Sequence, residues 1–221
     1  GDRGPGEATA GGRPFLLGED HGSPVLLCPV EAWYDGSLEI AGCEDLTESF
    51  DTWPWVDFVR CVWPEKYRTP RKIPSPEMVK ALLDTEGTLA SAARRTLEER
   101  SDLGLVTFSH FLPVDRTLPD WKDVDADVFD RERWFDHGAG STSAKFSLVA
   151  GSRLIDVHLR SLRGDGGDHV HVFGHSHRPK DFEWEGVRYV HNPLGKPRER
   201  ESGMVGIDVD FQLIWDTSHK G

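Results

Sequence analysis

Continuous apolar runs of strand length recur along the 221-residue chain and indicate its architecture. Val25–Val30 lacks the alternation of a half-exposed strand, so it predicts a strand buried on both faces of a sheet. Leu105–Phe108 predicts a second strand, and it ends just before a histidine. Further strands are expected at residues 15–17, 169–173 and 187–190, and a terminal hairpin at 205–209 and 213–215.

Two stretches carry the apolar spacing of an amphipathic helix. Residues 76–100 predict one continuous helix, with Ser75 as its N-cap and Pro76 at the first helical position. Residues 152–163 predict another, capped by Ser152. Strands interleaved with helices indicate an α/β fold, in which mixed sheets are flanked by helices.

Two long segments lack a regular period. Residues 36–75 are rich in tryptophan and proline, and predict an aromatic loop with one helical turn near residues 56–61. Residues 114–145 predict an acidic, irregular surface loop. Residues 1–13 are dominated by glycine and charge and are expected to be disordered or a linker, whereas 14–221 form a single domain.

The charge balance limits the classes of partner. With 26 Lys and Arg against 38 Asp and Glu the formal net charge is −12, so a nucleic-acid partner is not expected. A phosphate-handling enzyme remains compatible, since bound divalent metals supply positive charge locally. Cys28, Cys43 and Cys61 match no zinc spacing and predict free thiols in a reducing, cytoplasmic compartment. No signal peptide and no membrane-spanning apolar run is visible, so we expect no membrane contact.

Histidines follow two of the predicted strands. Gly174-His175-Ser176-His177 follows the run at 169–173, and His110 comes two residues after Leu105–Phe108. Imidazoles at the ends of rigid strands can act as metal ligands, the alternative being ordinary turn histidines. His169 and His171 lie within their strand and are expected to serve packing.

The chain resembles the calcineurin-like metallophosphoesterase superfamily. The similarity rests on Ser109-His110-Phe111-Leu112-Pro113, on Gly174-His175-Ser176-His177 and on the segment from Tyr189 to Arg200, and it runs from about residue 25 to the end. It implies a four-layer αββα sandwich and phosphoester hydrolysis by metal-bound hydroxide at two divalent ions, of Mn, Fe or Zn. By the same resemblance, His110 and His175 bind one metal ion and His177 the other.

The departures from this family are as informative as the matches. Its first half supplies Asp-x-His, Gly-Asp-x-x-Asp and Gly-Asn-His boxes, and none of these precedes His110. We therefore expect the carboxyl-side portion of such a domain, incomplete at its N-terminal side and with no identified general acid. Three neutral imidazoles cannot offset the repulsion of two dications, so at most one metal ion and poor turnover are expected.

Several expectations remain open at this point. The substrate is a small phosphorylated molecule, for which Arg198 and Arg200 are candidate contacts, with surface salt bridges as the alternative. A missing first half should expose an apolar sheet face and favour self-association. The alternative function is a non-catalytic remnant that binds metal or a partner. A carbohydrate- or nucleic-acid-binding surface on the tryptophan-rich loop is less favoured than either.

Overall fold

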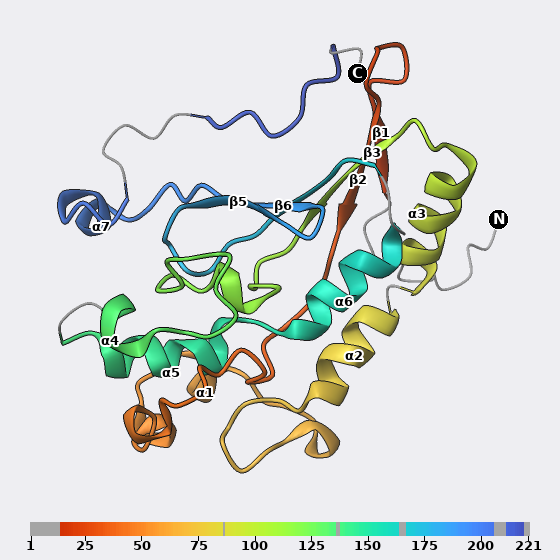
Figure 1. The fold of residues 1–221 in the computed structure, drawn as a ribbon. Coiled ribbons are helices and arrows are strands. Elements are labelled where there is room, and N and C mark those ends of the chain that lie inside the picture. The colour runs from red at the N-terminus through yellow and green to blue at the C-terminus, as the bar shows by residue number, and fades with distance from the viewer. Residues whose placement is uncertain (1–13, 86, 136–137, 164–166, 206–210, 219–221) are drawn as a thin grey trace.

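The computed structural model describes residues 14–85, 87–135, 138–163, 167–205 and 211–218, and these form one six-stranded mixed sheet with helices around it (Figure 1). The strand order is β1-β2-β3-β4-β6-β5. The strands are β1 (Phe15–Leu17), β2 (Val25–Pro29), β3 (Gly104–Phe108), β4 (His169–Val172), β5 (Lys180–Trp184) and β6 (Val187–His191). The predicted α/β class is therefore confirmed.

The four central strands, β2, β3, β4 and β6, run parallel, and the two edge strands are antiparallel to their neighbours. The apolar runs at 25–30 and 105–108 do form central strands, as predicted. Strand β5 was not predicted. It joins β6 through Glu185 and Gly186, whose φ angles of 46° and 75° are typical of a tight hairpin turn.

One face of the sheet is covered by helices α2 (Pro76–Thr85), α3 (Gly87–Glu99) and α6 (Arg153–Leu162) (Figure 1). The helix predicted over 76–100 is present as α2 and α3, which lie on either side of residue 86, and residue 86 is outside the described residues. Val79, Leu83, Ala90, Ala93 and Leu97 form the buried side of these two helices, and Leu82 is half-buried.

Helix α6 begins where the sequence predicts it. The side chain of Ser152, its N-cap, accepts a hydrogen bond from the backbone N–H of Leu154. The same hydroxyl donates to Oδ2 of the buried Asp35 at 2.7 Å, which ties the helix start to the loop after β2. Asp35 is thus a structural carboxylate.

The aromatic segment 36–75 is an irregular layer with short helices. The expected helical turn is present as α1 (Asp57–Arg60). Rings hold the layer together, as in the stacking of Trp53 on Trp55 at 5.0 Å and 13°. Four 3-10 turns lie in the two long loops: Glu44–Leu46, Phe50–Thr52, Glu65–Tyr67 and Asp115–Thr117.

Segment 114–145 is more regular than predicted, because it contains α4 (Arg131–Trp134) and the start of α5 (Gly140–Ala150). Helix α5 escapes a search for amphipathic periods because its last four residues, 147–150, are all buried. A third unpredicted helix, α7 (Pro197–Glu201), follows β6. No helix in the described ranges is both long and apolar enough to cross a bilayer.

The second face of the sheet carries a valine cluster: Val25, Val106, Val170 and Val190. Ile214 and Trp215 of the C-terminal segment pack against it, and Trp215 Nε1 donates to the backbone oxygen of Ser23 at 3.0 Å. The described residues thus form one sheet, not two, and the expected exposed face is covered at its centre by the chain itself. Residues 213–215 form no strand, and 206–210 of the predicted hairpin lie outside the described residues, as do 1–13.

Candidate active site

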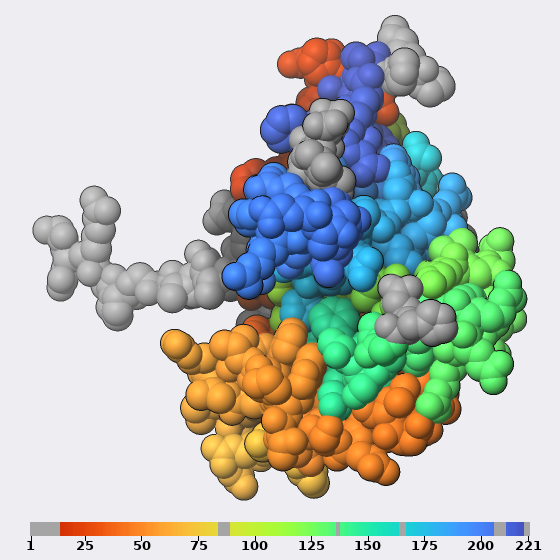
Figure 2. Space-filling model, turned by 90° about the vertical axis from the view of Figure 1, so that its left-hand side faces the viewer, coloured from red at the N-terminus to blue at the C-terminus, as the bar shows by residue number. Residues whose placement is uncertain are grey.

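A cleft of about 1000 Å³ opens at the carboxyl ends of the parallel strands. Ligands of open α/β sheets commonly bind at this edge. Figure 2 shows the hollow between the orange segment around residues 45–70 and the blue lobe that contains α7. The cleft receives residues from the ends of β2, β3 and β4, from the loop before α1, and from α5 and α7.

His110 and His175 meet in this cleft, although they are 65 positions apart in the sequence. The Nδ1 atom of His175 lies 3.0 Å from Nε2 of His110. The other nitrogen of His175, Nε2, lies 3.0 Å from the backbone oxygen of Val149. Since a carbonyl oxygen only accepts, His175 carries its proton on Nε2, and its Nδ1 lone pair faces His110.

The backbone around the Gly-His-Ser-His turn is strained. His175 and His177 have φ angles of 71° and 53°, in the left-handed region that costs non-glycine residues about 1 kcal/mol or more. The N–H of Gly174 donates to the backbone oxygen of His110 at 3.1 Å, so the two histidine loops are joined directly. Strain that the surrounding structure maintains is common at functional sites.

His177 has a different partner. Its Nδ1 lies 2.9 Å from Oε1 of Glu199, on α7. The other carboxylate oxygen of Glu199 accepts from the backbone N–H of Lys196 at 2.6 Å, and these two hydrogen bonds lower the pKa of Glu199. A carboxylate that holds one imidazole nitrogen leaves the other as the metal-binding atom, which is the usual arrangement behind histidine ligands.

Burial keeps the histidine pair neutral. It lowers the pKa of His175 to about 4, with His110 contributing in the same direction. Partial burial and the nearby His177 also lower the pKa of His110, while Asp57 acts in the opposite direction. Neutral imidazole is the form that binds metal ions, so both rings have the charge state of a ligand at neutral pH.

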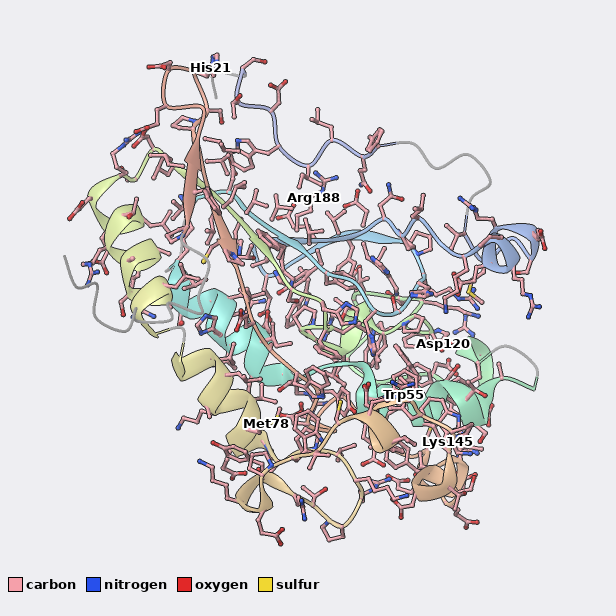
Figure 3. The ribbon with its side chains drawn as sticks, turned by 180° about the vertical axis from the view of Figure 1, so that it is seen from behind. His21, Trp55, Met78, Asp120, Lys145 and Arg188 are labelled. Atoms are coloured by element: carbon pink, nitrogen blue, oxygen red, sulfur yellow. The ribbon has the colours of Figure 1, made fainter. Side chains whose placement is uncertain are left out.

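Asp57 brings a carboxylate to the same cleft. Its Oδ2 accepts from Nε1 of Trp55 at 3.1 Å and from the hydroxyl of Tyr34 at 3.3 Å. Burial and the Asp57 charge raise the pKa of Tyr34, so that hydroxyl remains a donor. Figure 3 labels Trp55 within the dense group of side chains between α1 and α5.

The histidine pair fits half of a metal site. Two imidazole nitrogens at about 2.0–2.1 Å from one zinc ion lie roughly 3.3 Å apart in a tetrahedral arrangement, close to the observed separation of 3.0 Å. In the described portion of the chain, no group of three or more His, Cys, Asp and Glu side chains could hold one ion. The pair is therefore a partial donor set, and His177 stands apart from it beside Glu199.

Other candidate residues lie outside the cleft. Arg198 is exposed and Arg200 is half-exposed on α7, and neither lines it. His169 and His171 are buried, as expected of packing residues, and both bond to Oγ1 of Thr107, at 2.9 and 2.8 Å.

Sequence inspection missed three cleft residues: Asp57, Glu199 and Phe146. Glu199 lies between Arg198 and Arg200, the two candidate phosphate contacts. The sequence feature that could have identified it is an acidic residue two positions after Pro197, in the first turn of a helix. Asp57 lies in the aromatic segment 36–75, where no regular period marks it. Phe146 lies on the unpredicted helix α5, where it stacks on His175 at 5.3 Å and 29°.

The chain was compared with protein-family models, with curated proteins and with solved structures, and a match was found among the solved structures. No protein-family model matches the chain, and no curated protein matches it. The crystal structure of phosphopantetheinyl hydrolase (PptH) from Mycobacterium tuberculosis is similar, with a TM-score of 0.51 and 20% sequence identity. The match covers 86% of this chain and 56% of that one, so this chain spans little more than half of its neighbour. At this identity the likeness concerns the fold alone, an α/β arrangement of one sheet with helices around it.

Proposed function

We propose that this chain holds the histidine side of a divalent-metal site and takes part in metal-dependent phosphoester hydrolysis. The fold similarity to a phosphopantetheinyl hydrolase supports the general class. The observation that carries the proposal is the orientation of His175: its Nε2–H donates a hydrogen bond to the backbone oxygen of Val149, and its Nδ1 lone pair faces His110. Such fixing of the tautomer by a backbone oxygen is typical of histidine ligands.

His110 and His175 would hold one ion, of Mn, Fe or Zn, and His177 would serve a second where further ligands complete the site. A bound ion would act as a Lewis acid toward the phosphoryl oxygens and lower the pKa of a water molecule. Glu199 orients His177 through its Nδ1 proton. Asp57 and Glu199 also add two negative charges to the cleft, which partly offset the charge of bound cations.

Metal titration of the chain tests the proposal directly. Calorimetry with Mn²⁺ and Zn²⁺, together with the visible spectrum of bound Co²⁺, should show an ion lost in His175→Ala and in His110→Ala. His21→Ala is the matched control, because His21 is exposed and lies far from Trp55 at the opposite end of the molecule (Figure 3). Unchanged ion affinity in both cleft variants would refute the proposed ligands.

Turnover is measured on the same samples with p-nitrophenyl phosphate and bis(p-nitrophenyl) phosphate in Mn²⁺. We expect slow hydrolysis that His175→Ala abolishes. The second candidate function is a non-catalytic domain that binds metal or a partner. The partial donor set favours it, and ion binding without any turnover would select it over the hydrolase.

A further inference from the structure

The walls of the cleft are largely apolar. Trp33, Trp55 and Phe146 lie near the histidines, and Leu82 and Met204 extend the apolar lining toward α2 and beyond α7. A site that handled only inorganic phosphate or a small polar ester would gain nothing from such walls, because apolar surface is stabilised by removal from water. The lining therefore indicates an organic group attached to the phosphate.

The charged side chains that line the cleft are mostly acidic. Three carboxylates, Glu31, Asp57 and Glu199, stand against one cation, Lys196, and no arginine is among the described lining residues. Arginine is the usual bidentate partner of phosphate groups. A ligand with several phosphates, such as a nucleoside triphosphate, would meet net repulsion here, whereas a single phosphate meets Lys196 and any bound cation.

Trp55 is a preorganised surface beside the histidine pair. Its Nε1 proton is donated to Asp57, and its ring stacks on Trp53 at 5.0 Å, so two contacts fix its orientation. The ring centroid lies 5.8 Å from that of His175, with the planes at 89°. A ring that is already held in place loses little side-chain entropy when a ligand packs on it.

We propose that the cleft selects phosphoesters with a single phosphate group and an uncharged aromatic or aliphatic organic group, and that Trp55 is the surface on which this group packs. The inference rests on the proposed function for the position of the phosphate. It adds the class of substrate, which neither the fold nor the histidines specify.

Phosphonates, which cannot be hydrolysed, separate binding from catalysis. Calorimetry with the full chain, with and without Mn²⁺, would compare 1-naphthylmethylphosphonate, methylphosphonate and ATP. We expect the naphthyl compound to bind at least about tenfold more tightly than methylphosphonate, because it buries an aromatic ring against tryptophan. ATP should bind more weakly than the naphthyl compound.

Three variants locate the effect. Trp55→Ala should remove most of the preference for the naphthyl compound and leave methylphosphonate affinity within about twofold, whereas Trp55→Phe should keep part of it. Trp184→Phe is the control, since Trp184 packs on Tyr189 outside the cleft and should change nothing. Circular dichroism and melting curves would establish that each variant is folded.

Each outcome bears on one proposal. Equal affinity for the two phosphonates, no binding of either, tighter binding of ATP, or a preference that survives Trp55→Ala would overturn the substrate class. Naphthyl selectivity without turnover of any phosphoester would leave the substrate class standing as a binding specificity and refute the hydrolase. Turnover with equal kcat/KM for naphthyl and methyl phosphate would support the hydrolase and refute the proposed substrate class.

Discussion

His175 presents its Nδ1 atom to Nε2 of His110 at 3.0 Å, while its other nitrogen donates to the backbone oxygen of Val149. The metal-free pair is a hydrogen bond in which His110 donates from Nε2. To bind an ion through that same atom, His110 must move its proton to Nδ1. Of the two imidazoles, only His175 is therefore held in the tautomer that such a site requires.

Gly174 controls the spacing of this pair. An added Cβ at position 174 would lie 3.2 Å from the backbone oxygen of His110, which is closer than ordinary packing, and 3.5 Å from its Nδ1, an ordinary contact. We expect Gly174→Ala to shift the His110 loop by a few tenths of an ångström and to weaken ion binding about tenfold. Stability should change by only about 1 kcal/mol.

Gly140→Ala is the matched control, because its Cβ would also meet a neighbour at 3.2 Å, but that neighbour is the side chain of Phe135. A side chain can move aside, so ion binding should be unaffected. Calorimetric titration with Zn²⁺ and urea unfolding of both variants make the comparison. Equal ion affinity of Gly174→Ala and the wild-type chain would contradict the link between the two loops.

Ser152 is a second position with a clear expected cost. Its hydroxyl caps α6 and donates to the buried carboxylate of Asp35 at 2.7 Å. Ser152→Ala removes both bonds and leaves Asp35 short of a donor, so we expect a loss of about 2–3 kcal/mol in the free energy of unfolding. Ser161→Ala, on the exposed side of the same helix, should cost less than about 1 kcal/mol. Urea unfolding of both variants measures these losses, and equal midpoints for Ser152→Ala and Ser161→Ala would contradict the prediction.

The sequence was a good guide to elements whose signal is local. Val25–Val30 is apolar throughout and Leu105–Phe108 is apolar except for Thr107, and both lie inside the sheet. Ser152 caps a helix with a clear inward stripe. The two histidine motifs were found because each follows such a strand, and parallel strands bring their carboxyl ends to one edge.

Elements whose burial comes from distant segments could not be predicted in this way. The last turn of helix α5 is buried in the hydrophobic cluster that it shares with the aromatic loop, so its apolar positions show no single face. Strand β5 alternates between half-buried and exposed positions, and its pairing depends on the turn at Glu185 and Gly186. Asp57 joined the site because the aromatic loop folds back over the cleft, which no spacing in the sequence reveals.

Gly151 is a described position at which neighbouring backbone leaves no room for a side chain. A Cβ there would lie 1.9 Å from the backbone oxygen of Leu112, at the bridge between the His110 loop and the end of α5. Backbone atoms on both sides cannot give way independently, so Gly151→Ala should cost more than about 3 kcal/mol or prevent folding. Gly186→Ala, where the space is open and φ is 75°, should cost only about 1 kcal/mol from backbone strain. Similar urea unfolding curves for Gly151→Ala and Gly186→Ala would show that the backbone at Leu112 can move to make room for a Cβ at position 151.

Acid should destabilise the chain through its buried histidines. Burial, with Arg163 and Arg160 adding to it, lowers the pKa of His169 to about 4, against about 6.5 in an unfolded chain. Between these values the unfolded chain binds more protons than the folded one, so stability falls as the pH falls from about 6.5 to 4. His169 makes its full contribution to the free energy of unfolding when the pH is above about 6.5, the pKa of histidine in the unfolded chain. That contribution, roughly 3 kcal/mol, is lost once the pH is below about 4, the pKa in the folded chain.

His169→Gln tests this directly, because glutamine can keep a hydrogen bond to Thr107 but does not titrate. Near pH 5 the variant should take up about one proton fewer on unfolding, seen as a shallower slope of unfolding free energy against pH. His171, whose pKa burial also lowers, keeps part of the slope in place. An identical slope for His169→Gln and the wild-type chain would mean that His169 is already protonated in the folded protein at pH 5.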